Sequence, residues 1–205
     1  MKLYGNGRSR WVKPYWLLRE LDVPFEPVIV SAMRGETRTP AFLAMNPTAK
    51  VPVLEEDGHA VFESTAKCAY LADKHRERGL IPAPGTLDRA RHDQWVSVAV
   101  TELEQPLWRI ARHTFIYPTE KRSLADITLA CDDFRRLLRR VSSAFAGDTL
   151  LPAFSVADIT MAYTLRWASG VVGQGDLLAD APEARAYLDR QCARPAFPRE
   201  LYGEG

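Results

Sequence analysis

The chain has 205 residues, of which 46% are hydrophobic, with 27 Lys and Arg against 26 Asp and Glu. A net charge of +1 provides no long-range field that would gather nucleic acid or anionic lipid, so neither partner is expected. The three cysteines are far apart and odd in number, which predicts reduced thiols and a cytoplasmic setting. No apolar stretch reaches the roughly 20 residues of a membrane span, so we expect a protein that is neither exported nor embedded.

The first 80 residues alternate between strand-like and helix-like patterns. A strand at 2–4 ends at Gly5-Asn6-Gly7, and the helical spacing that follows predicts a helix over 11–21. The remaining elements are predicted as a strand at 24–30, a short helix from 39 that ends before Asn46-Pro47, strands at 51–55 and 60–62 joined at Asp57-Gly58, and a helix over 64–75. The order βαβαββα predicts an α/β domain over residues 1–80.

Residues 81–86, Ile-Pro-Ala-Pro-Gly-Thr, form the clearest break in the sequence and are interpreted as a linker. After the linker the pattern is helical without strand alternation. Helices are predicted at about 87–112, 119–145, 155–169 and 182–191. The sequence therefore predicts an all-helical domain over residues 87–205.

Three local features carry information about function or stability. The first is Val51-Pro52, a proline beside strand-like residues. Proline cannot donate to a sheet ladder, so it marks an edge or a special turn. A cis bond would expose the Val51 backbone for pairing with an extended peptide, but cis bonds are scarce, and the residues alone favour an ordinary trans proline.

The second feature is Glu63-Ser64-Thr65, at the start of a predicted helix. A helix-capping role for Ser64 or Thr65 is sufficient to explain a hydroxyl there. A helix N-terminus also binds carboxylates, and Glu63 beside it can bind an ammonium group. The combination suits an amino-acid head group that carries both charges.

The third feature is Ser155, followed three residues later by Asp158 just before an apolar run. This spacing is typical of a capping box, and we interpret it as purely structural.

With these features in this order, the sequence resembles the cytosolic glutathione transferase family over nearly its whole length. The matching stretches are 46–54 (NPTAKVPVL), 62–65 (FEST) and 154–159 (FSVADI). The resemblance implies a thioredoxin-like first domain, a helical second domain, a homodimer and a cis Pro52. Glutathione would be a co-substrate, with no other cofactor and no metal, since the four histidines are scattered without ligand spacing.

Carried over by position, the resemblance implies a glutathione site in the first domain. The Val51 backbone beside Pro52 would bind the cysteinyl part, Glu63 with Ser64 would bind the γ-glutamyl head, and Lys50 would help hold the glycine carboxylate. Where many relatives have His or Gln, this chain has Thr37. We therefore expect Arg34 or Arg38 to bind that carboxylate instead.

The mechanism depends on how the glutathione thiol becomes a thiolate. A thiol pKa of about 8.5 must fall by about 2 units, or roughly 2.7 kcal/mol, which one hydrogen bond and a helix N-terminus can supply. Ser9 is the only Ser, Thr or Cys between the first strand and first helix, and relatives with a catalytic cysteine place it at Arg10. The resemblance thus implies a serine-type enzyme with catalytic Ser9, although a turn or capping role for Ser9 stays open. Tyr4 is the other hydroxyl candidate, but it lies within the strand.

The second substrate is expected in a cleft between the domains, against an apolar wall. Candidate residues for that wall are Trp108, Ile110, His113, Phe115 and Tyr117, and Trp11 is expected to close the other side of the cleft. Aromatic residues at helical spacing ordinarily pack in the core. A structural role for His113 is as plausible from the sequence as a catalytic one.

The sequence predicts a transferase that joins glutathione to a hydrophobic electrophile. Two alternatives remain: glutathione-dependent peroxide or disulfide reduction, and a non-catalytic binding or regulatory protein with the same fold.

Overall fold

The computed structural model describes residues 1–204, which form two compact units. The first unit contains Met1–Ile81 together with the chain from Arg194 on, and the second contains Pro82–Ala193. The boundary at Ile81 lies inside the segment predicted as a linker. The residues from Arg194 on were expected in the helical domain, and the structure places them in the first unit instead.

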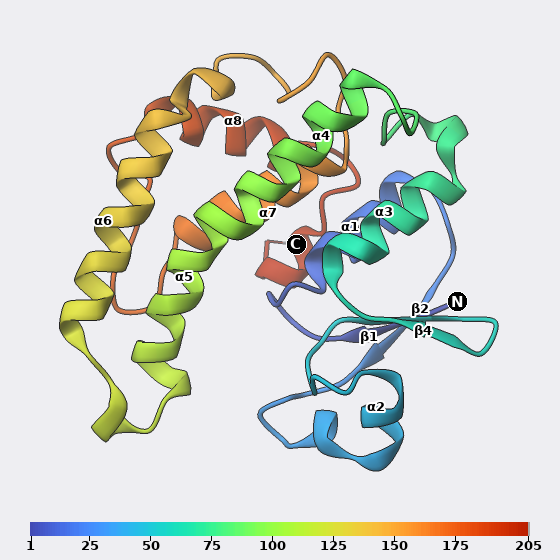
Figure 1. Cartoon of the computed structure of the whole chain (residues 1–205), viewed down its shortest axis with the longest axis horizontal. Coiled ribbons are helices and arrows are strands. Elements are labelled where there is room, and N and C mark those ends of the chain that lie inside the picture. The colour runs from blue at the N-terminus through green and yellow to red at the C-terminus, as the bar shows by residue number, and fades with distance from the viewer. Residues whose placement is uncertain (205) are drawn as a thin grey trace. The chain divides into compact units, whose positions relative to one another are not determined.

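The first unit is a four-stranded mixed sheet with helices on both faces (Figure 1). The strand order is β2-β1-β3-β4, with β1 parallel to β2 and antiparallel to β3. Helices α1 and α3 pack together on one face, and α2 lies against the other. The elements in chain order are β1 (Lys2–Gly5), α1 (Val12–Glu20), β2 (Glu26–Ile29), α2 (Pro40–Met45), β3 (Val53–Glu56), β4 (His59–Val61) and α3 (Ser64–Lys74). The predicted order βαβαββα and the thioredoxin-like fold are confirmed.

Local chemistry sets several of these boundaries. The Thr39 hydroxyl accepts a hydrogen bond from the Phe42 amide at 3.3 Å and caps α2, which has Pro40 in its first turn. Asp57 and Gly58 turn β3 into β4 with φ angles of 51° and 78°. Two successive left-handed residues are what a tight hairpin turn needs, which is why this dipeptide predicted the hairpin.

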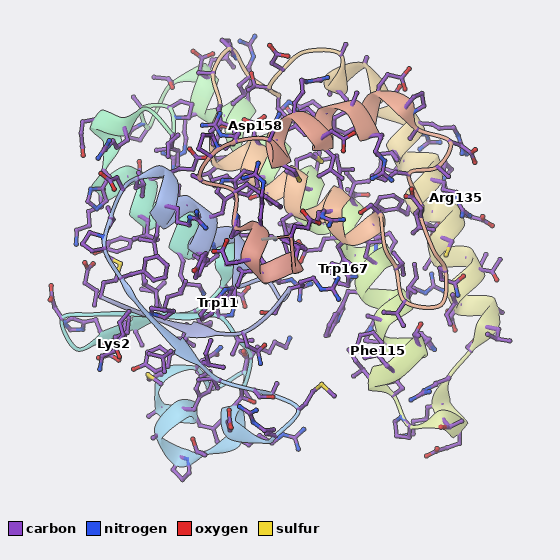
Figure 2. The ribbon with its side chains drawn as sticks, turned by 180° about the vertical axis from the view of Figure 1, so that it is seen from behind. Lys2, Trp11, Phe115, Arg135, Asp158 and Trp167 are labelled. Carbon is purple, nitrogen blue, oxygen red and sulfur yellow. The ribbon has the colours of Figure 1, made fainter. Side chains whose placement is uncertain are left out.

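The junction between β1 and α1 is closely packed around Trp11. This side chain is 1% exposed and stacks on Tyr15 with ring centroids 5.4 Å apart (Figure 2). A Cβ atom on Gly5 would lie 2.3 Å from the Trp11 ring, so only glycine fits at the end of β1. The chain therefore leaves the sheet against a buried indole.

The tail of the first unit is held against α1 by charged and aromatic contacts. Arg194 donates to both carboxylate oxygens of Glu20, at 2.7 and 2.9 Å, and Trp16 Nε1 donates to the same carboxylate at 2.9 Å. The ring of Phe197 meets the Trp16 ring edge-on with centroids 5.1 Å apart. These contacts explain why the tail packs with the first unit rather than with the helices that precede it.

The second unit is all-helical, as predicted. Helix α7 is buried along most of its length and packs against α4 and α8, while α5 packs against α6 (Figure 1). The elements are α4 (Leu87–Ser97), a π-helical stretch (Val98–Leu103), α5 (Glu104–Ala111), a second π-helical stretch (Arg112–Ile116), α6 (Leu124–Arg140), α7 (Val156–Ala168) and α8 (Pro182–Cys192). Pro106 lies in the first turn of α5 and has no N–H to donate to a carbonyl of the preceding turn. The π-helical stretch lies in that preceding turn, directly before α5.

The start of α7 carries a buried hydrogen-bond centre at Asp158 (Figure 2). Its Oδ2 accepts from the Ser155 amide at 2.9 Å, and the Ser155 hydroxyl accepts from the Ala157 amide at 3.3 Å, so the predicted capping box is confirmed. Its Oδ1 accepts from the Leu150 amide and from the Tyr187 hydroxyl, both at 2.8 Å. Burial raises the pKa of Asp158, while these hydrogen bonds act in the opposite direction.

Two findings bear on the environment of the chain. Within residues 1–204, every helix is too short or too polar to serve as a membrane span. The three cysteines are free thiols, with Cys68 and Cys131 buried.

Candidate active site

The register of the sheet brings several chain segments to one end of the first unit. Tyr4 is paired with Val53, Gly5 with Ile29, and Leu54 with Val61. Because β1, β2 and β4 end where β3 begins, the segments 6–11, 30–39, 46–52 and 62–64 all leave the sheet at that end. These segments contain every residue predicted for thiol activation and glutathione binding: Ser9, Arg34, Arg38, Lys50, Val51, Pro52, Glu63 and Ser64.

The 46–52 segment is organised by the side chain of Asn46, which is 2% exposed. Its Nδ2 donates to the Lys50 carbonyl at 2.7 Å, and its Oδ1 accepts from the amide and the hydroxyl of Thr48 at 3.0 and 2.8 Å. Ala49 takes a left-handed conformation with φ of 55°. One buried amide therefore fixes the path of the loop that leads to Val51.

The Val51–Pro52 peptide bond is cis, as the family resemblance implies and contrary to the trans proline that the residues alone favour. Within the described chain, neither the N–H nor the C=O of Val51 takes part in a backbone–backbone hydrogen bond outside the regular elements. The Pro52 carbonyl accepts from Lys67 Nζ at 2.9 Å. The Val51 backbone groups are thus left for another partner, as an extended peptide requires.

Helix α3 begins directly after Glu63, whose φ of 67° is unusual for a residue other than glycine. Glu63 occupies the capping position without a side-chain capping bond, and Ser64 is the first helical residue. The prediction that Ser64 or Thr65 caps this helix is therefore wrong. Because no side chain caps the helix, the first-turn amides remain available to an anion.

Ser9 lies in the turn between β1 and α1, half-buried. Its hydroxyl donates to the Asn6 carbonyl at 2.8 Å and accepts from the Trp11 amide at 3.4 Å. The structure therefore shows Ser9 in the turn role that the sequence left open. If the Ser9 hydroxyl donates to a thiolate, that hydrogen bond replaces the one to the Asn6 carbonyl. Tyr4 donates to Glu55 at 2.5 Å, and this hydrogen bond raises the pKa of Tyr4 to about 12, which makes Tyr4 a poor activating group.

The cations near this end of the sheet differ in their pairing. Arg34 Nε is bonded to Glu36 at 2.8 Å, so its charge is already compensated. Thr37 is 2% exposed, so its side chain is buried and does not face a ligand at the surface. Arg38 and Lys50 are exposed, and no side-chain ion pair joins either of them to the described residues. Of the predicted carboxylate-binding cations, Arg38 and Lys50 fit that role better than Arg34.

The residues predicted for the second substrate lie in both units. Trp11, predicted to close the other side of the cleft, is a core residue of the first unit at 1% exposure, which leaves little of its side chain for contact with a substrate. In the second unit, Trp108 lies on α5 and is half-buried, while Phe115 is 56% exposed in the second π-helical stretch (Figure 2).

His113 has a structural position. Its Nδ1 accepts a hydrogen bond from the Ser123 amide at 3.1 Å, its Nε2 lies 3.9 Å from Asp126 Oδ2, and the Tyr117 ring packs on it edge-on. Ser123 is the capping residue of α6, so His113 ties the end of one helical run to the start of the next.

We expect His113→Ala to lower stability by about 1 kcal/mol, because the Ser123 amide loses its acceptor. Thermal unfolding should show a decrease of roughly 2–4 °C for a protein of this size. Turnover with glutathione and an aryl halide should stay at the wild-type value. A loss of turnover with unchanged thermal stability would instead place His113 in the reaction.

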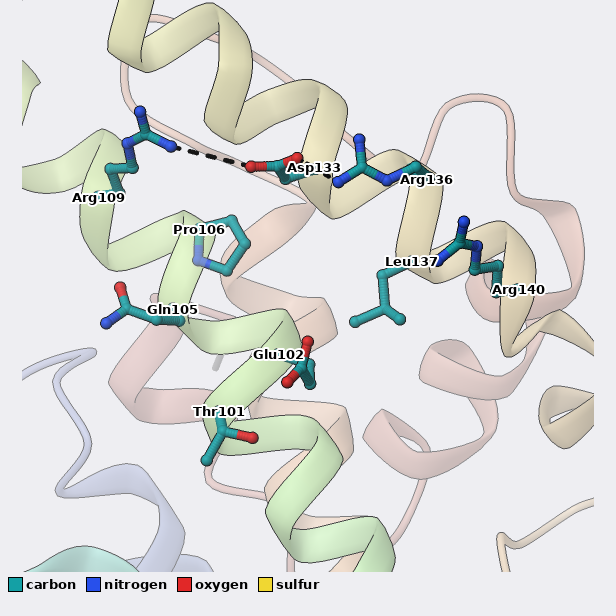
Figure 3. Close-up of a pocket in the computed structure, with 9 residues that line it drawn as sticks. All are labelled: Thr101, Glu102, Gln105, Pro106, Arg109, Asp133, Arg136, Leu137 and Arg140. Atoms are coloured by element: carbon teal, nitrogen blue, oxygen red, sulfur yellow. Dashed lines mark hydrogen bonds and ion pairs between the residues drawn. The ribbon is translucent and has the colours of Figure 1, made fainter.

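A groove of about 390 Å³ lies between α5 and α6 in the second unit (Figure 3). Asp133 stands between Arg109, at 3.8 Å, and Arg136. Glu102 and Arg140 also line the groove. This charged groove contains none of the predicted second-substrate residues, and its chemistry differs from the apolar wall expected for an electrophile.

No group of three or more His, Cys, Asp or Glu side chains in residues 1–204 is arranged to hold a metal ion.

Comparison with known proteins agrees with this geometry. Residues 1–73 match the glutathione S-transferase N-terminal domain, and residues 109–190 match the C-terminal domain. The chain is 31% identical to glutathione S-transferase GstB of Escherichia coli, over 78% of this chain and 79% of that protein. The chain belongs to the glutathione S-transferase family. Among plant members, it is 29% identical to glutathione S-transferase F13 of Arabidopsis thaliana, over 96% of this chain and 93% of that one.

A solved member of the glutathione S-transferase family shows the same architecture. The structure of a sphingomonad glutathione S-transferase complexed with glutathione is similar with a TM-score of 0.84 and 32% identity, covering 100% of this chain and 99% of that one. The predicted family and fold are confirmed.

Two residues at the sheet end were not assigned a role from the sequence. Asn46 was noted only at the end of a predicted helix and in a matching stretch, and Lys67 was not considered. Lys67 could have been found from spacing, because the buried face of α3 runs through Ser64, Lys67, Cys68, Leu71 and Ala72, at intervals of three and four residues.

Proposed function

We propose that this protein is a glutathione transferase that binds glutathione at the end of the sheet where β3 begins. The observation that carries the proposal is the register, which brings the unpaired Val51 backbone and the uncapped start of α3 to the same place. The cysteinyl part of glutathione would pair with Val51, and the γ-glutamyl carboxylate would lie on the α3 amides and Ser64. Glu63 would face the ammonium group, and Arg38 or Lys50 the glycine carboxylate.

The reaction follows from this placement. The bound thiol loses its proton to solvent water, and the thiolate attacks an electrophilic carbon of a hydrophobic second substrate. A carbon–sulfur bond forms, and the leaving group departs with its electron pair. The protein stabilises the thiolate and supplies proximity, without covalent chemistry of its own. The Ser9 hydroxyl and the N-terminus of α1 are the groups we assign to thiolate stabilisation.

A second candidate is a protein that binds glutathione without activating its thiol. The observation that favours it is the bond between the Ser9 hydroxyl and the Asn6 carbonyl, which gives Ser9 a role within its own turn. The two candidates differ in the pKa of the bound thiol, which the ultraviolet absorbance of the thiolate reports during a pH titration. A bound thiol with the pKa of free glutathione would favour the second candidate.

The test of the proposed site is calorimetric titration of glutathione into wild-type protein and the Ser64→Ala variant, followed by conjugation of glutathione to an aryl halide. We expect saturable binding that Ser64→Ala weakens roughly tenfold, because a hydrogen bond to a charged group contributes about 1.5 kcal/mol or more. Ser143→Ala, at an exposed serine of the second unit, is the matched control and should bind normally. No binding by the wild type at millimolar glutathione would reject the proposal.

We further expect a homodimer in the cytoplasm. Free thiols suit a reducing compartment. Light scattering during gel filtration measures the mass of the assembly, and a monomer at micromolar concentration would contradict the expected dimer.

A further inference from the structure

The first unit buries two lysines in its interior. Lys13 on α1 and Lys67 on α3 are each 0% exposed. Lysine is almost never fully buried unless its charge has a partner, because an ammonium group loses much solvation free energy away from water. The buried ammonium of Lys67 donates a 2.9 Å hydrogen bond to the carbonyl of Pro52, fifteen residues away along the chain.

The surroundings of Lys67 make its charge costly. The titratable groups that act on Lys67 are Cys68, beside it on α3, and Glu63, at the capping position of the helix, while Lys13 on α1 acts on Cys68. Burial lowers the pKa of Lys67 to about 8, and burial raises the pKa of Cys68 to about 12. An apolar side chain of similar volume avoids this desolvation, and such replacements of buried charges are often neutral or stabilising. Stability therefore does not account for a lysine at this position.

The place of Lys67 in the fold suggests a reason for the lysine that is not stability. Ser64 and Lys67 lie one turn apart on the buried face of α3. Ser64 stands at the start of the helix, where we place the γ-glutamyl head, and Lys67 reaches the carbonyl next to Val51, where we place the cysteinyl part. The Asn46 side chain fixes the other side of the same loop through the Lys50 carbonyl at 2.7 Å.

We propose that Lys67 is a positioning residue for the glutathione site, holding the Pro52 carbonyl so that the Val51 backbone groups face the ligand at a fixed distance from the start of α3. This inference rests on the proposed function. Two side chains then set the loop, Asn46 from within it and Lys67 from α3. The ammonium also places a positive charge behind a ligand whose net charge is negative.

The experiment uses S-methylglutathione, which has no thiol, so thiol ionisation does not affect its binding. Calorimetric titrations between about pH 6.5 and about pH 9 cover the range in which Lys67, with its lowered pKa, changes charge. The variants are Lys67→Met, which removes the charge, and Lys67→Arg, which keeps it at every pH used. Lys74→Met removes a lysine from the same helix whose partner is Glu56, away from the loop, and serves as the control.

At neutral pH, Lys67→Met should weaken binding about five- to tenfold, the difference expected for one charge-assisted hydrogen bond. Its melting temperature should equal or exceed that of the wild type, since the buried charge is gone. A merely structural role predicts the opposite pattern, a lower melting temperature.

The pH profile gives a second readout. Wild-type affinity should fall as the pH rises through about 8, because the ammonium is lost there. Lys67→Met should lack that step. Lys67→Arg should lack it too while binding like the wild type at neutral pH. Any slope that remains in Lys67→Met comes from the ligand amine.

Each outcome decides the question. Wild-type affinity and an unchanged pH profile in Lys67→Met would overturn the inference while leaving the proposed function in place. If Lys67→Met does not fold, a pH step that persists in Lys67→Arg overturns it. A wild-type protein that does not bind S-methylglutathione overturns the proposed function and the inference with it.

Discussion

Replacing Ser9 with alanine should lower turnover about ten- to a hundredfold while glutathione affinity stays within a few-fold of wild type. The reason is that a hydrogen bond to a thiolate contributes roughly 1.5–3 kcal/mol and is made only after the proton has left the thiol. Binding of the neutral thiol does not need this bond. Steady-state kinetics with glutathione and an aryl halide, together with calorimetry, measure the two effects separately.

Because Ser9 also bonds to Asn6 within its turn, Ser9→Ala has a structural effect that must be separated from the catalytic one. Loss of the turn bond should cost about 0.5–2 kcal/mol of stability. Loss of thiolate stabilisation should raise the pKa of the bound thiol by about 1 unit or more, since one unit corresponds to 1.36 kcal/mol. The rate profile should therefore shift to higher pH, and Ser9→Thr, which keeps a hydroxyl, should restore much of the activity. A profile with an unchanged midpoint would remove Ser9 from the mechanism.

Replacing Asp158 with alanine should cost about 3–5 kcal/mol of folding free energy, the largest effect on stability that we expect from a single substitution in this chain. The substitution removes the acceptor of the Leu150 and Ser155 amides and of the Tyr187 hydroxyl. Each buried donor left without a partner costs about 1–3 kcal/mol. The melting temperature should fall on the order of 10 °C.

Asp189 on α8 offers a matched control, because it is an exposed aspartate in the same unit. Asp189→Ala should change stability by less than about 0.5 kcal/mol. Denaturant unfolding of both variants gives the comparison. A loss below about 1 kcal/mol in Asp158→Ala would mean that other groups or water replace the carboxylate as acceptor.

Elements with a local cause could be predicted from the sequence. Asp57-Gly58 specifies its turn because both residues tolerate left-handed backbone, and Ser155 with Asp158 specifies the start of α7 because both partners lie within one turn. The cis bond at Pro52 was different. The residues alone favoured trans, and only the resemblance to a family pointed to cis.

Features with a tertiary cause could not be predicted in this way. Glu63, between β4 and α3, takes a positive φ and occupies the capping position, so the helix begins one residue earlier than a serine cap would allow. Trp11 is buried beneath Gly5, a contact that depends on how the chain leaves the sheet. The spacing of α3 could place Lys67 on the buried face, but its hydrogen bond to the Pro52 carbonyl, fifteen residues away, could not be predicted. In each case the deciding neighbour is distant in sequence or depends on the three-dimensional path.

The tail that packs on α1 makes the helical unit an insertion within the first unit rather than a domain appended to it. Glu20 and Trp16 are synthesised early, but their partners Arg194 and Phe197 follow only after the whole helical unit. During synthesis, the unit that begins first therefore cannot be completed until the other unit has left the ribosome. A fragment cut at Ile81 would leave one carboxylate and one indole of α1 without the groups that cover them.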